Sequence, residues 1–194
     1  MKKRQFLGTA ALAGFSAAIS LPARAAAGAA GPTLLTVTGA IGAGNRGKLD
    51  PVRDQLMFKQ KLSFDKAHAF DYAALTALPA ITIKPTLEYD GKQHTLRGPL
   101  LLDVVKAAGA KAGNNTRLVL RAIDGFAASV TVAQAQAQRF IVATHLDGAP
   151  MALGGLGPLW AVYDADKIPD MAAKPVADRF GQCPWGLYHI EVQA

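Results

Sequence analysis

The chain has 194 residues, of which 21 are basic and 14 acidic, so its formal net charge is +7 at neutral pH. It contains one cysteine, Cys183, which excludes an intramolecular disulfide and leaves the fold to a hydrophobic core. Four basic residues fall in the first 25 positions, so the remainder carries a formal charge of only +3 and no Lys/Arg cluster. That balance excludes an electrostatic surface for nucleic acid.

The first 25 residues have the pattern of a bacterial secretory signal peptide. A basic start at residues 2–4 precedes an Ala- and Gly-rich apolar stretch at 6–21, and Ala23-Arg24-Ala25 is a small-x-small cleavage signal. The apolar stretch is too short for a membrane-spanning helix. Residues 3–8 also resemble a twin-arginine signal, so export in the folded state and ordinary unfolded secretion both stay open. We expect a soluble periplasmic or secreted protein that begins near Ala26.

A glycine-rich segment at residues 42–48 follows the strand-like run 34–38 and satisfies the G-x-G-x-x-G pattern of nucleotide-binding loops. A P-loop needs a Ser or Thr directly after its Lys, whereas Leu49 follows Lys48 here. No long apolar helix opens at the last glycine, as a dinucleotide-binding fold requires. The segment therefore predicts a flexible loop and not a nucleotide site.

Three Asp-Gly pairs lie between strand-like runs, at 90–91, 124–125 and 147–148. Asp-Gly adopts the positive φ angles that a two-residue hairpin turn demands, so each pair predicts a hairpin. Pro85 removes a hydrogen-bond donor from the first hairpin, which places that strand at an edge or a bulge. Three hairpins indicate a largely antiparallel sheet system.

A few short helices are predicted between the strands, so the fold class is α+β with mixed, largely antiparallel sheets. The helices are expected at residues 72–78, at 100–108 with Pro99 in the first turn, and at 132–139; later come a strand at 159–163, an irregular segment at 164–181 and a last strand at 187–192. We divide the chain into a signal peptide (1–25), an N-terminal strand with the glycine-rich loop (26–69) and a main domain (70–194) that forms one globular unit with residues 33–69.

Four stretches in the main domain resemble, in their order and spacing, the oxidoreductase molybdopterin-binding domain of sulfite oxidases and their small exported relatives. They are Leu-Arg-Gly-Pro-Leu-Leu-Leu-Asp-Val-Val at 96–105, Ala-Ile-Asp-Gly-Phe-Ala at 122–127, Leu-Asp-Gly-Ala-Pro-Met at 146–151 and Gly-Pro-Leu-Trp-Ala-Val-Tyr at 157–163. The resemblance covers residues 70–192 and implies a mixed α+β domain that, in the enzymes of the family, binds a molybdenum-pterin cofactor and oxidises or reduces small molecules.

The resemblance also implies site residues, and here the chain departs from the family. A Cys in the loop after the strand preceding the G-x-P-L helix holds the metal, but residues 81–96 of this chain contain no Cys. Basic residues expected at the pterin phosphate are scattered, which leaves Arg97 and Arg121, with Gly157, as candidates for cofactor binding. We expect the molybdenum-pterin site to be lost.

Cys183 is the one residue that could replace the missing ligand, although it lies about a hundred residues later in the chain. It is a candidate catalytic residue and metal ligand, and its alternative role is that of a small buried hydrophobe. His145 and His189 lie in strand-like runs and are the other catalytic candidates, with a Cys183–His189 pair as one arrangement.

Two functions from different classes stay open. The first is a non-catalytic small-ligand, partner-binding or sensory module that kept the fold after losing its cofactor. The second is a periplasmic molybdenum-pterin oxidoreductase that acts on a small molecule through an atypical metal ligand. Fold alone does not decide between them.

Overall fold

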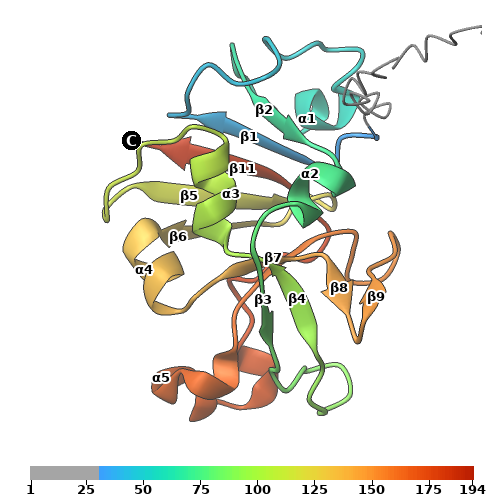
Figure 1. Ribbon diagram of the computed structural model, residues 1–194, viewed down its shortest axis with the longest axis vertical. Helices are drawn as coiled ribbons and strands as arrows, with labels where there is room; N and C mark the ends of the chain where they lie inside the picture. The colour runs from blue at the N-terminus through green and yellow to red at the C-terminus, as the bar shows by residue number, and fades with distance from the viewer. Residues whose placement is uncertain (1–30) are drawn as a thin grey trace, which may run out of the picture. The chain divides into compact units, whose positions relative to one another are not determined.

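Five strands form the main sheet, in the order β2-β1-β11-β5-β6 (Figure 1). The computed structural model describes residues 31–194, and these form one compact unit, Gly31–Ala194. The strands are β1 (Leu35–Gly39), β2 (His68–Phe70), β5 (Arg117–Ala122), β6 (Ala127–Thr131) and β11 (Leu187–Gln193). β1 runs parallel to β11, and every other pair in this sheet is antiparallel.

Two smaller sheets complete the strands. One has the order β3-β4-β8-β9, with β3 at Ala80–Ile83, β4 at Leu96–Pro99, β8 at His145–Leu146 and β9 at Ala149–Pro150. The other pairs β7 (Ile141–Ala143) with β10 (Trp160–Val162). β4 and β7 approach so closely at Gly98 that only a glycine fits there. A Cβ atom at this position would lie 2.0 Å from the carbonyl oxygen of Val142.

Short helices connect these strands. They are α1 (Gln55–Lys59), α2 (Tyr72–Thr76), α3 (Leu101–Ala107), α4 (Val132–Ala137) and α5 (Pro169–Ala172), with single 3-10 turns at Ala165–Lys167 and Val176–Asp178. Asp71 caps α2 by accepting the N–H of Ala74, and Thr131 and Gln134 form a reciprocal capping box at the start of α4. These caps fix where the two helices begin.

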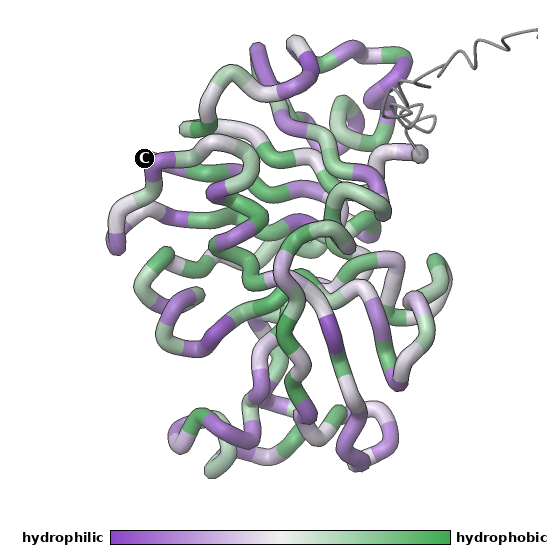
Figure 2. Tube along the Cα trace, in the orientation of Figure 1, coloured by the Kyte–Doolittle hydropathy of each residue, from purple (hydrophilic) through white to green (hydrophobic). Residues whose placement is uncertain are grey.

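The core is formed by the apolar side chains of all three sheets and of α3, and green, hydrophobic stretches of chain converge there in Figure 2. Leu101, Val104 and Val105 of α3 are buried. The largest side chains with almost no solvent exposure are those of Trp160 and Phe140. No helix among residues 31–194 is both long and apolar enough to span a membrane.

The predicted α+β class with mixed and antiparallel sheets and few helices is confirmed. The helix expected at 100–108 begins only at Leu101, because Pro99 ends β4 and Leu100 has extended angles (φ −59°, ψ 138°). The segment 164–181, expected to be irregular, holds α5 and the two 3-10 turns. The signal peptide expected over residues 1–25 lies outside the described residues.

The glycine-rich loop is not the flexible segment that we expected. Asn45 and Arg46 both donate their backbone N–H groups to the carbonyl of Ala67, and the Asn45 side chain exchanges two hydrogen bonds with the backbone of Ala69. Arg46 forms an ion pair with Asp54 just before α1. Backbone pairing to residues 67–69 therefore holds this loop against the edge of the main sheet.

The three Asp-Gly pairs occupy different turns. Asp147 and Gly148 both have positive φ (49° and 84°) and form a two-residue turn between β8 and β9. Residues 123–126 lie between β5 and β6, and the N–H of Ala122 donates to the carbonyl of Phe126, which closes a turn over residues 123–125. Only Gly125 in this turn has positive φ (96°), so it is not the two-residue turn predicted there. Asp90 and Gly91 lie in the long loop between β3 and β4, closed by hydrogen bonding between Leu87 and Lys92.

Substitutions at two glycines compare a position where the backbone conformation requires glycine with a position where a larger side chain has room. Gly125→Val should lower the free energy of unfolding by about 1–3 kcal/mol, because a β-branched residue is strained at φ 96°. Gly47→Val should cost less than about 0.5 kcal/mol, because a Cβ atom at Gly47 meets nothing within 4 Å. Urea denaturation of both variants measures the difference, and equal losses would contradict it.

Candidate functional site

The segment that carries Cys183 is fixed against the edge of the β7–β10 sheet. The indole N–H of Trp160 donates to the carbonyl of Cys183 at 2.9 Å, and Ala161 donates its N–H to Pro184. The N–H of Cys183 itself donates to the carbonyl of Phe180. These bonds set the position of the Cys183 thiol before β11 begins.

The loop between β3 and β4, residues 84–95, lies against the same segment. Asp166 accepts both the N–H and the hydroxyl of Thr86 at 2.8 Å, and its other oxygen accepts from Arg179 at 2.7 Å. The carbonyl of Arg179 in turn accepts the Tyr163 hydroxyl at 2.6 Å. These hydrogen bonds anchor the β3–β4 loop, which corresponds to the loop that carries the metal-binding Cys in the molybdopterin-binding family that the sequence resembles.

Three segments meet to form a cavity of about 240 Å³, which we call the aromatic pocket. They are the β3–β4 loop, the β5–β6 loop and the segment before β11. The lining side chains with recognisable chemistry are Glu88, Tyr89, Asp124, Phe126, Cys183 and Trp185. The structure therefore brings Cys183 to the loop that lacks the family's Cys.

Aromatic side chains form the rim of this pocket and reach solvent. Tyr89 is 55% exposed, Phe126 47% and Trp185 39%. Burial of part of the Tyr89 side chain, together with the neighbouring Glu88 carboxylate, raises the pKa of Tyr89 to about 12. The phenol of Tyr89 therefore stays neutral at the pocket.

The thiol of Cys183 sits at the closed end and is only 4% exposed. Burial raises the pKa of the Cys183 thiol well above its usual range, although the N–H of Tyr163 lowers it in part, and the Glu88 carboxylate adds the smallest, raising effect. A raised thiol pKa opposes the thiolate form, which is the form that binds metals and attacks electrophiles. Cys183 therefore has the environment of a buried hydrophobe.

The residues of this pocket do not fit a molybdenum-pterin group. Such a site needs a thiolate for the metal and basic side chains for the pterin phosphate, but none of the described residues that line the pocket is basic. Glu88 and Asp124 add negative charge instead. Within residues 31–194 there is also no group of three His, Cys, Asp or Glu side chains placed to hold a metal ion.

Arg121 and His189 belong to a separate network on the main sheet. Arg121 forms an ion pair with Glu191 at 2.8 Å and contacts Nδ1 of His189 at 3.3 Å, while Nε2 of His189 lies 2.9 Å from the Thr38 hydroxyl. A guanidinium only donates, so Nδ1 of His189 accepts and Nε2 carries the proton. Both ring nitrogens are therefore occupied, and the Cys183–His189 pair that the sequence suggested is not formed.

Burial, with a smaller contribution from the Arg121 charge, lowers the pKa of His189 to about 4. His189 is thus a neutral, structural imidazole, and Arg121 is committed to Glu191. These partners hold both side chains within the main sheet, apart from the aromatic pocket.

The remaining candidates lie apart from one another. His145 bonds to the Tyr72 hydroxyl through Nε2 and to the Thr144 hydroxyl through Nδ1. Arg97 is exposed on β4 beside His145. Gly157 precedes Pro158 and packs against Met151, where a Cβ atom would lie 2.6 Å from the Met151 side chain. None of these three lines the aromatic pocket.

Sequence reasoning missed two features. Glu88 and Tyr89 were not singled out, although they stand in the stretch where the family's Cys is expected, and that position was the available signal. His94 was also missed: Nδ1 lies 2.6 Å from Asp147 and Nε2 lies 3.1 Å from Asp90, and these two carboxylates raise the pKa of His94. No short sequence spacing links His94 to Asp147.

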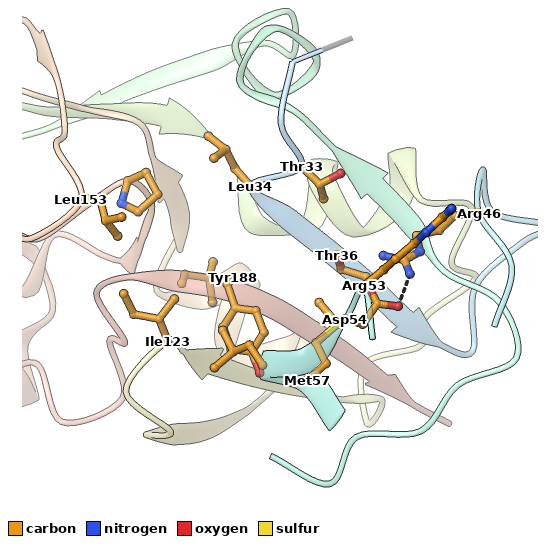
Figure 3. A pocket seen from close by; sticks show the side chains of 13 residues that line it. Thr33, Leu34, Thr36, Arg46, Arg53, Asp54, Met57, Ile123, Leu153 and Tyr188 are labelled. Atoms are coloured by element: carbon orange, nitrogen blue, oxygen red, sulfur yellow. Dashed lines mark hydrogen bonds and ion pairs between the residues drawn. The ribbon is translucent and has the colours of Figure 1, made fainter. Parts of the chain in front are cut away.

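A second, larger cavity of about 450 Å³ opens between β1, α1 and the start of β11 (Figure 3). Its walls are mainly apolar, and the Arg46–Asp54 ion pair lies at one end, as the dashed line in Figure 3 marks. Asp54 also accepts the N–H of Asp50, so the Arg46 and Asp54 charges are paired within the chain, whereas Arg53, which lines the same cavity, forms no ion pair among residues 31–194. None of the candidate catalytic, metal-binding or cofactor-binding residues lines this cavity.

The burial of Cys183 predicts low thiol reactivity. In the native protein at pH 8, Ellman's reagent should react with Cys183 at least about tenfold more slowly than with a free thiol, because both access and ionisation are opposed. In denaturing urea one thiol per chain should react rapidly. Fast stoichiometric labelling of the native protein would contradict the buried environment.

The His189 network predicts loss of stability in acid. The unfolded imidazole takes up a proton near pH 6.5, whereas the folded one does so only near pH 4, so stability is present above 6.5 and falls as the pH drops toward 4. The loss should reach roughly 3 kcal/mol. In His189→Gln, whose amide can keep both hydrogen bonds, the free energy of unfolding measured by urea titration should fall less steeply over this range. Equal slopes in both proteins would show that His189 is not responsible.

Comparisons with known proteins find a similarity in fold to a solved structure but no match in sequence. No protein-family model matches the sequence, and no curated protein matches it. Among solved structures, the fold is similar to that of the sulfane dehydrogenase SoxCD from Paracoccus pantotrophus, with a TM-score of 0.53 and 11% sequence identity. The match covers 82% of this chain and 37% of that chain, so the chain spans little more than a third of that protein. The likeness supports a distant relation, in fold alone, to the oxidoreductase fold that the sequence motifs predicted.

Proposed function

We propose that this chain is an exported small-ligand-binding module built on a molybdopterin-oxidoreductase-like fold, with the aromatic pocket as its binding site. The pocket is concave, lies where three loops meet, and combines exposed aromatic faces with a few polar groups, which is the usual composition of a ligand site. The signal-peptide pattern of residues 1–25 supports export to the periplasm.

The observation that carries this proposal is the environment of Cys183. The one thiol of the chain is buried beside the loop in which the resemblance places a metal-binding Cys, and this burial is the main effect that opposes its ionisation. A ligand site for molybdenum would need the opposite environment, with positive charge nearby. The pocket favours binding over redox chemistry.

The second candidate is a molybdenum-pterin oxidoreductase that uses Cys183 as a displaced ligand. One observation favours it: Cys183 lines the same cavity as Glu88 and Tyr89, in the loop where the resemblance places the family's Cys. The two candidates differ in what the purified protein contains.

Metal content separates the two functions. After expression in a host that makes the molybdenum-pterin cofactor, the purified protein should contain far less than one molybdenum per chain, and Cys183→Ser should leave that content unchanged. The buried hydroxyl should cost roughly 1–3 kcal/mol of stability without a spectroscopic change. A molybdenum enzyme of the sulfite-oxidase type, expressed in parallel, is the control for cofactor supply. Near-stoichiometric molybdenum that disappears in Cys183→Ser would establish the second candidate instead.

A further inference from the structure

The aromatic pocket has a charge that contrasts with the rest of the chain. The chain after residue 25 has a formal net charge of +3, whereas the only charged side chains that line this pocket are the carboxylates of Glu88 and Asp124. Neither carboxylate forms an ion pair with a basic side chain of residues 31–194. One oxygen of Asp124 accepts the N–H of Phe126 at 2.8 Å, which holds that carboxylate at the mouth of the pocket.

The exposed aromatic rings of the molecule gather at this same place. Four aromatic side chains are prominently exposed in residues 31–194, and three of them, Tyr89, Phe126 and Trp185, line this one pocket. They come from three separate segments, so local sequence does not explain their clustering. Exposed apolar surface that is concentrated at one cavity marks a binding site more strongly than scattered exposed residues do.

We propose that the aromatic pocket binds a small organic cation, either a quaternary ammonium or a protonated amine. The faces of Trp, Tyr and Phe rings attract cations, and several rings around one cavity are the usual receptor for a methylated ammonium group. The two unpaired carboxylates add a favourable charge. This inference rests on the proposed function, since it names the ligand class of the same pocket.

The other ligand classes fit less well. An anion would approach two carboxylates with no basic partner in the lining. A metal ion would lack a group of three ligating side chains, as none exists among the described residues. A cavity of about 240 Å³ is smaller than the roughly 300–1,000 Å³ of most ligand sites, which suits a compact ammonium compound and not a large cofactor.

The test is a titration of the purified protein by calorimetry at low salt, with choline chloride as the cation and 3,3-dimethylbutan-1-ol as its neutral isostere. The two probes have almost the same shape and differ in charge. Choline should bind at least about tenfold more tightly than the alcohol. Fluorescence of Trp185 provides a second readout, since Trp160, the other tryptophan of the chain, is fully buried.

Variants assign the binding to this pocket. Trp185→Ala and Phe126→Ala should each raise the dissociation constant for choline by roughly 3- to 30-fold, and Glu88→Gln should raise it without affecting the neutral alcohol. Phe58→Ala is the matched control, because Phe58 is 48% exposed, much like Phe126, but lies on α1 outside the pocket. Circular dichroism and the melting temperature confirm that each variant is folded.

The possible outcomes test separately whether the ligand is a cation and whether the chain is a ligand-binding module. Equal affinity for choline and the alcohol, with loss in Trp185→Ala, would overturn the cation class and leave a ligand-binding pocket. Absence of choline binding, or equal weakening in Phe58→Ala and Phe126→Ala, would also overturn it. Molybdenum that depends on Cys183 would overturn the proposed function itself, and metal analysis of the same protein sample detects that separately.

Discussion

The pairing of β11 with strands on both of its sides is the constraint on which the rest of the structure depends. β11 pairs in parallel with β1 and antiparallel with β5, so it joins the first and the later parts of the described chain in one sheet. Gly186, directly before it, has φ 60° and lies against Ile123, and Ile123 donates its N–H to the Gly186 carbonyl. The entry of β11 therefore places Trp185 and Cys183 beside the β5–β6 loop, and the aromatic pocket follows from the sheet.

The main sheet and the aromatic pocket differ in how their charged side chains are paired. On the main sheet, Arg121 is held by Glu191 and by a neutral His189, so a positive charge is neutralised within the fold. At the aromatic pocket, Glu88 and Asp124 have no basic partner among the described residues. Charges that are satisfied internally stabilise structure, whereas charges left beside a cavity act on whatever enters it. This contrast is in keeping with the proposal that the aromatic pocket is the binding site.

Sequence patterns predicted the parts of the fold that depend on neighbouring residues. The helix predicted at 100–108 and the strand predicted at 187–192 correspond to α3 and β11, with ends that differ by at most one residue, because helix and strand periods are local properties. Loop lengths were less predictable. The turn at Asp124-Gly125 has one residue more than the predicted two-residue turn, because the register of the flanking strands β5 and β6 decides the loop length. The site was predicted only in part. Cys183 was identified as a residue of interest, but its position beside Glu88 depends on contacts between segments almost a hundred residues apart.

His94 gives the chain a reversible cross-link of a kind that its single cysteine cannot supply. The imidazole bridges Asp90, in the β3–β4 loop, and Asp147, in the β8–β9 turn. Both links are available only while the ring is protonated, because a neutral imidazole has one N–H and can donate to one carboxylate alone. When the ring loses its proton, it can donate to only one of the two carboxylates, while the backbone of Thr95 still exchanges hydrogen bonds with Asp147. Asp90 directly follows Tyr89, so the protonated ring supports the residue next to one wall of the aromatic pocket from outside the pocket.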